Sequence, residues 1–183
     1  MTSLDTVNEL RSNIERIINR YLHEMLTADS ESRFNHRATI QAIAFVANKI
    51  ALIPHTIVDK ITDAATDASV GKDVSIRIRH THKISSYIPD VDGDEMMCML
   101  RKRLQLLVRY ELDLGRKWIV DLNLPQRFED CMDVIDKYML FAEKLQLLPE
   151  YDIEHTRAAQ NACRKGNFSL NEICYHLKGI QNE

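Results

Sequence analysis

Apolar residues recur every three or four positions along most of the chain, and this spacing predicts amphipathic helices. The first predicted helix covers residues 5–26 and ends in the polar run 28–37, where we expect a connection. Its apolar stripe consists of Val7, Leu10, Ile14, Ile17, Ile18, Tyr21, Leu22 and Met25. Thr6 and Glu9 match a capping box, in which two side chains accept the first backbone N–H groups of a helix.

Residues 40–53 are apolar nearly all round, which predicts a helix buried in the middle of a bundle and ended by Pro54. A shorter helix, opened by Thr56 with Asp59, is expected to end at Gly71. The same spacing predicts further helices over residues 94–114, 125–148, 151–165 and 169–178, the first of them capped by Asp92 or Asp94. The state of residues 116–124 stays open.

Glycine and proline are scarce, with five and four residues in a chain of 183. These residues fall between the periodic segments, apart from Gly179 in the last predicted turn. All-β chains need many more turns, so this composition argues against that class. The sequence therefore predicts a mainly α protein, a single helical domain over residues 1–183 that forms a compact bundle of about seven helices.

The period changes to two residues after Gly71. Val74, Ile76 and Ile78 alternate with polar residues, a pattern typical of a half-buried strand. Near residues 72–88 the sequence therefore predicts either a small β-hairpin, with residues 84–88 as the return strand, or an ordered excursion between helices.

The same stretch is locally basic in a chain whose net charge is −3. Its candidate partner-binding side chains are Arg77, Arg79, His80, His82 and Lys83. An extended segment with these cations on one side could contact phosphates or an acidic protein surface. The plainer alternative is a solvated segment without a partner.

Acidic residues gather in the predicted helix 125–148. Glu129, Asp133 and Asp136 share one side of it by helical spacing, and we take them as a second candidate partner-binding surface. This face could equally be solvated, or could complement the chain's own cations, the cluster 101–103 included. A magnesium site would need a matching acidic pair on another helix, and the sequence offers none.

Other chemistry finds little support in the sequence. His155, Cys163, Cys174 and His176 lack the close paired spacing of structural zinc sites, so we predict no metal and no cofactor. The two C-terminal predicted helices could form a helix-turn-helix, but an ordinary helical hairpin suits their composition better. No nucleophile elbow, P-loop or dinucleotide fingerprint is present, and we predict no enzyme.

No apolar stretch reaches the length of a membrane span, and no signal peptide opens the chain, so we expect no membrane association and a cytoplasmic location. The widely spaced cysteines agree with a reducing compartment. We therefore predict a non-enzymatic, cytoplasmic helical protein with a regulatory or adaptor role, which binds a macromolecular partner, above all another protein, self-association included. The alternatives are a nucleic-acid-associated regulator that uses residues 72–83 and, after it, a small helical enzyme.

Overall fold

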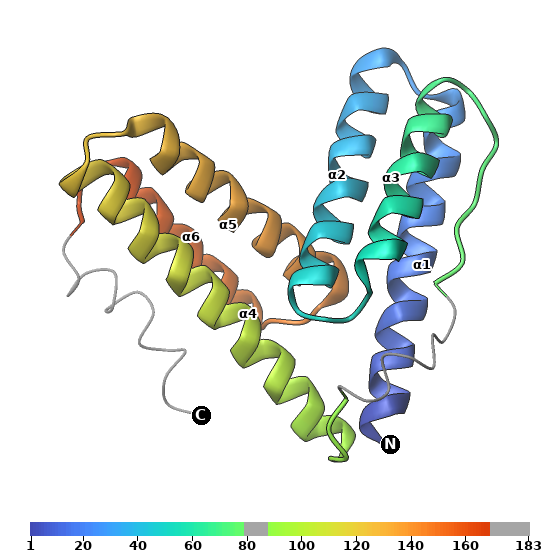
Figure 1. Cartoon of the computed structure of the whole chain (residues 1–183), viewed down its shortest axis with the longest axis horizontal. Coiled ribbons are helices and arrows are strands. Elements are labelled where there is room, and N and C mark those ends of the chain that lie inside the picture. The colour runs from blue at the N-terminus through green and yellow to red at the C-terminus, as the bar shows by residue number, and fades with distance from the viewer. Residues whose placement is uncertain (79–87, 169–183) are drawn as a thin grey trace. The chain divides into compact units, whose positions relative to one another are not determined.

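A computed structural model describes residues 1–78 and 88–168 of the chain. That part is mainly helical (Figure 1). Its α-helices are α1 (Ser3–Thr27), α2 (Ser30–Lys49), α3 (His55–Ser69), α4 (Gly93–Arg116), α5 (Pro125–Leu145) and α6 (Glu150–Arg164), and a short π-helix, η2 (Lys117–Asp121), follows α4. The mainly α prediction is confirmed, with six α-helices described where about seven were predicted. The seventh predicted helix, residues 169–178, lies outside the described residues.

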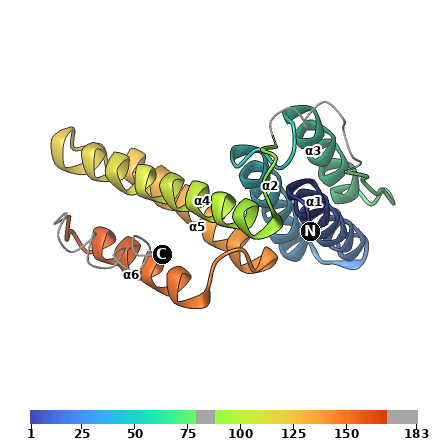
Figure 2. The same ribbon diagram turned by 90° about the horizontal axis from the view of Figure 1, so that it is seen from below.

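The chain divides into two compact units, Met1–Leu100 and Arg101–Glu183. The predicted single domain over residues 1–183 stays a prediction. In the first unit α1, α2 and α3 pack against one another, as Figures 1 and 2 show from two directions. Their shared core is aliphatic and includes Ile14, Ile18, Leu22, Ile40, Ile43, Val46 and Ile61, each of them almost fully buried.

The start of α2 corrects one prediction. Residues 30–37 are helical, although the polar run 28–37 predicted a connection. The helix begins directly after Asp29, whose Oδ1 accepts a hydrogen bond from the Ser32 backbone N–H at 2.7 Å. Asparagine, aspartate and serine satisfy the unpaired N–H groups of a first turn well, so a polar stretch can begin a helix as well as separate two.

Two predicted helix starts are also wrong. α1 begins with a capping box between Thr2 and Asp5, whereas Thr6 is buried in the first turn. α3 begins at His55 after Pro54 and has no side-chain cap, so Thr56 does not open it. The predicted end of α3 holds, because Gly71 has a φ of +84°, a conformation that glycine adopts without strain.

Residues 72–78 form no strand, which makes the hairpin prediction wrong for the described part of this segment and favours the ordered excursion. The two-residue period is nevertheless real. Ile76 and Ile78 are buried, whereas Ser75 before them and Arg77 between them are exposed. The segment packs along α1, where side chains of that helix take its backbone hydrogen bonds in place of a partner strand (Figure 1).

In the second unit, α5 packs against α6 and against η2, and its residues Phe128, Cys131 and Met132 lie close to Gly115 of α4. Gly115 was expected to end its helix, but α4 continues through it to Arg116 and then widens into η2. This π-helix, followed by a hydrogen bond from Leu124 N to Trp118 O at 2.8 Å, settles the region whose state the sequence left open. Pro125 begins α5 as expected, and Gln146 ends it in a left-handed conformation with φ of 51°.

Candidate functional site

The basic segment is only partly described. Arg77 is exposed on the excursion, between two buried isoleucines. Its neighbours are anchored on α1, since the Ile78 N–H donates to Glu15 Oε2 at 2.6 Å. The other four predicted residues of this group, Arg79, His80, His82 and Lys83, lie outside the described residues. Their part in partner binding stays a prediction.

The acidic residues of α5 are exposed, as their spacing predicted. Two of them also meet α6. Arg164 Nε lies 3.7 Å from Glu129 Oε2, and its terminal nitrogen donates to Asp136 Oδ2 at 3.2 Å. Gln160 Nε2 donates to Asp136 Oδ1 at 2.8 Å. Glu129 and Asp136 therefore help to hold α6, and the cation that complements them is Arg164 rather than the 101–103 cluster.

The outward side of α4 in the second unit carries apolar and basic side chains together. We call it the α4 surface and define it by Lys102, Arg103, Leu106, Arg109 and Tyr110, all of them exposed. Helical spacing places these five side chains on one side of the helix. The opposite side of the helix is buried and carries Leu104, Val108 and Leu112.

The exposure of apolar side chains on this surface is large. Leu106 is 66% exposed and Tyr110 is 60% exposed. Val120, Leu122 and Leu124 follow in and after η2, so five of the eleven large apolar side chains exposed in the described residues fall within residues 106–124. Single exposed leucines are common on proteins, but gathered apolar side chains mark interaction sites.

The α4 surface is also strongly basic. Residues 101–110 contain four lysine or arginine residues and no aspartate or glutamate. Arg101 Nε donates to Leu147 O at 2.8 Å, which fixes it within the unit. Among the described residues, Lys102, Arg103 and Arg109 take part in no ion pair. As far as the described residues go, these three cations are therefore available to an acidic partner.

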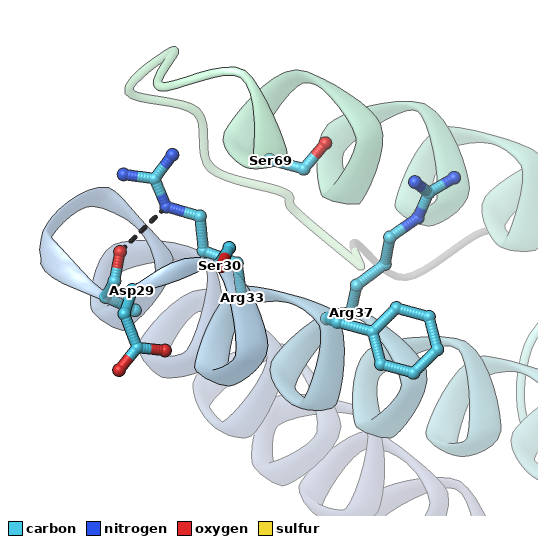
Figure 3. A pocket seen from close by; sticks show the side chains of 7 residues that line it. Asp29, Ser30, Arg33, Arg37 and Ser69 are labelled. Carbon is cyan, nitrogen blue, oxygen red and sulfur yellow. Dashed lines mark hydrogen bonds between the residues drawn. The ribbon is translucent and has the colours of Figure 1, made fainter.

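A second candidate site lies in the first unit, where α2 begins and α3 ends. It is an open cavity of about 460 Å³, which we call the Arg33–Arg37 pocket (Figure 3). Its lining residues are Ala28, Asp29, Ser30, Arg33, Phe34, Arg37 and Ser69. Arg33 Nε donates to Ala28 O at 2.9 Å, and an Arg37 terminal nitrogen donates to Thr66 Oγ1 at 3.3 Å.

A smaller cavity of about 330 Å³ lies between the end of α5 and the start of α6. It is lined by three glutamates and by Arg157, which donates to Glu143 Oε1 at 2.6 Å. The arginine is thereby committed to its neighbouring helix. This cavity offers carboxylates and no unpaired cation, and we assign it no role.

The described residues contain no group of three histidine, cysteine or acidic side chains placed to hold a metal ion. Of the four residues considered for zinc, His155 and Cys163 lie on α6, and the other two lie outside the described residues. Burial raises the pKa of both the Cys131 and the Cys163 thiols to about 11. Neither thiol is a ready nucleophile at neutral pH, because the thiolate is the reactive form.

Within the part of the chain that the structure describes, none of the helices combines the length and the apolar character needed to cross a bilayer. Comparisons with protein-family models, with curated proteins and with solved structures found no match to this chain.

Sequence reasoning missed both sites for identifiable reasons. On α4, helical spacing from Leu100 and Leu104 continues to Leu107 and Leu114 and would place both in the core, but both are only half-buried. The apolar residues that fall off the buried stripe, Leu106 and Tyr110, were the available signal. The Arg33–Arg37 pocket was missed because residues 28–37 were expected to form a connection, in which no helical spacing would relate the two arginines.

Proposed function

We propose that this chain is a non-enzymatic cytoplasmic binding protein, and that the α4 surface docks an acidic amphipathic segment of a protein partner. The observation that carries the proposal is the exposure of Leu106 and Tyr110 among cations that take part in no ion pair within the described residues. The widely spaced cysteines support the cytoplasmic part of the proposal.

The chemistry of the surface defines the partner. Tyrosine is favoured at protein interfaces because it combines a large apolar ring with a polar tip. The flanking cations would attract carboxylates during approach and fix the orientation of the docked segment. A second copy of this chain is a poorer partner, because a symmetric contact would place the same cations opposite each other.

Co-purification from the cells that produce the protein tests this proposal. The double variant Leu106→Ser, Tyr110→Ser should lose the partner, and the charge reversal Lys102→Glu, Arg103→Glu should lose it as well. Tyr151→Ser is the matched control, because Tyr151 is 46% exposed on α6 and lies outside the α4 surface. A synthetic peptide of the partner's acidic segment should bind the wild-type chain, and more weakly as salt is added.

Three results would contradict the proposal. The first is equal recovery of the partner by the double variant and by the wild-type chain. The second is a wild-type chain that shifts RNA or DNA in a mobility assay and loses that binding in the charge reversal, which would assign the surface to nucleic acid. The third is a dimer in light scattering that the double variant converts to monomer, which would assign the surface to a second copy.

A further inference from the structure

A turn at the end of α6 redirects the chain. Gly166 follows the helix with a φ of +82°, and the Asn167 N–H donates to Ala162 O at 2.9 Å. A left-handed glycine with such a hydrogen bond ends a helix and sends the next residues away from the helix axis. Figures 1 and 2 both show this end of α6 at the same end of the second unit as η2.

Phe168, the last described residue, lies against the start of α5. Its ring meets the Phe128 ring edge to face, with 5.8 Å between the ring centroids. Phe128 is almost fully buried and lies close to Gly115 of α4, where an added Cβ would be 3.4 Å from the Phe128 ring. The edge-to-face contact is a favourable aromatic geometry. It defines the point from which residues 169–183 leave the described part of the chain.

Exposed apolar side chains begin one helical turn from this contact. Leu124 directly precedes α5, and its carbonyl accepts the Phe128 N–H at 3.2 Å. Val120, Leu122 and Leu124 are 51%, 50% and 44% exposed, and we call these three residues the η2 patch. Gathered apolar exposure of this kind marks an interaction site.

The charge of this region distinguishes the η2 patch from the α4 surface. Residues 117–124 carry one cation, Lys117, and one anion, Asp121, whose charges cancel. The patch therefore offers apolar contact without a preference for one sign of charge, whereas the α4 surface attracts carboxylates. An occupant with an apolar stripe and little net charge suits the η2 patch.

The chain itself supplies a segment with this character directly after Phe168. Residues 169–183, which lie outside the described residues, contain two acidic residues and one basic residue. Their apolar residues recur at helical spacing and so belong to one stripe. The members of this stripe are Leu170, Ile173, Cys174 and Leu177.

The connection to Phe168 places this segment within reach of the η2 patch. Leu170 is two residues beyond Phe168, which corresponds to at most about 7 Å of extended chain. Because the segment is tethered beside the patch, its docking is intramolecular and requires no high affinity. We infer that residues 169–183 dock on the η2 patch of their own chain through the apolar stripe.

Photo-crosslinking within the full-length chain tests this inference. A benzophenone amino acid at position 122 should crosslink to a peptide from residues 169–183, which mass spectrometry identifies. The same group at position 151, exposed at the start of α6, is the matched control and should give no such crosslink. Mixing chains of two isotopic compositions shows whether both crosslinked peptides come from one chain, as the inference requires.

The single tryptophan of the chain provides a second measurement, because Trp118 lies in η2. The double variant Ile173→Ser, Leu177→Ser should shift the Trp118 emission to longer wavelength and increase its quenching by acrylamide, since water reaches an uncovered patch. Tyr175→Ser is the control and should change neither, because helical spacing places position 175 on the side opposite the stripe. Circular dichroism checks that each variant keeps its helices.

Several results would overturn the inference. One is the absence of a crosslink from position 122 to residues 169–183, or an equal crosslink from position 151. Crosslinks between chains of different isotopic composition would assign the patch to a second copy, and crosslinks to a co-purified protein would assign it to a separate partner. Unchanged Trp118 emission and quenching in the double variant would contradict the stripe as the contact. Every variant leaves residues 102–110 intact, so these results are independent of the proposed function.

Discussion

The side chain of Asn19 makes the backbone hydrogen bonds to Ile76 that a neighbouring strand would make in a sheet. Its amide nitrogen donates to Ile76 O at 2.9 Å, and its amide oxygen accepts the Ile76 N–H at 2.8 Å. One side chain on α1 thus satisfies both polar groups of a residue that is buried on the excursion. Asparagine is suited to this position because its amide both donates and accepts.

Replacing this side chain should therefore release the excursion. We expect Asn19→Ala to lower the free energy of unfolding by about 1–3 kcal/mol, because two partly buried backbone groups lose their partners. Urea unfolding measures the loss, and hydrogen exchange should show faster exchange of the Ile76 amide. Asn13→Ala is the control on the same helix, where Asn13 only accepts a hydrogen bond from the exposed Arg16. An unchanged Ile76 exchange rate in Asn19→Ala would contradict this account.

Because a buried thiol resists ionisation, the free energy of unfolding should depend on pH in the alkaline range. Burial raises the pKa of Cys163 from its ordinary value of 9.0 to about 11, so the unfolded chain loses this proton at lower pH than the folded chain does. The free energy of unfolding should therefore fall as pH rises from about 9 to about 11. Cys163→Ala should make this fall shallower in urea unfolding, whereas Cys98→Ala, at an exposed position, should leave it unchanged. Equal slopes in all three proteins would refute the assignment.

At the scale of elements, the contact between α4 and α5 depends on a glycine inside a helix. A Cβ at position 115 would lie 3.0 Å from Met132 Cε and 3.4 Å from Cys131 Cβ. Alanine in a helix interior ordinarily stabilises a protein by up to about 1 kcal/mol relative to glycine. Here the close approach of α5 opposes that gain.

Two substitutions at this position separate the opposing effects. We expect Gly115→Ala to change the free energy of unfolding by less than about 1 kcal/mol, since the Met132 side chain can shift. Gly115→Val should lower it by about 1–3 kcal/mol, because its branched side chain overpacks the contact. Urea unfolding of both variants measures the difference. Stabilisation by valine would show that α5 does not lie as close to Gly115 as described.

Elements were predictable wherever the spacing of apolar residues along the sequence matches the side that is buried. The apolar stripe of α1 is buried as predicted, apart from the half-buried Ile17, and the two-residue alternation correctly placed Ile76 and Ile78 inward. The two-residue spacing of apolar residues does not say what an extended segment packs against. The hairpin prediction failed because side chains of α1, and not a second strand, form the backbone hydrogen bonds of residues 76 and 78. The start of α2 failed for a related reason, because Asp29 and the serines after it suit a helix cap as well as a loop.

At the scale of the whole molecule, the candidate sites were harder to predict than the helices. Arg33 and Arg37 become neighbours only once residues 30–37 are known to be helical, and Ser69 joins them only through the packing of α2 and α3. On α4 the basic residues were visible in the sequence. The apolar residues between them were not assigned to the surface, because the side that Leu106 occupies depends on where α5 packs.

Site-specific photo-crosslinking tests the central claim most directly, because it reports which residue a bound partner touches. A benzophenone amino acid placed at position 106 or 110 should crosslink the co-purified partner, and the crosslinked peptide of the partner should be acidic. The same group at position 34 or 151, where the native side chains are also exposed, should give no crosslink to it. A partner that crosslinks from position 34 or 151 and not from 106 or 110 would contradict the assignment of the α4 surface.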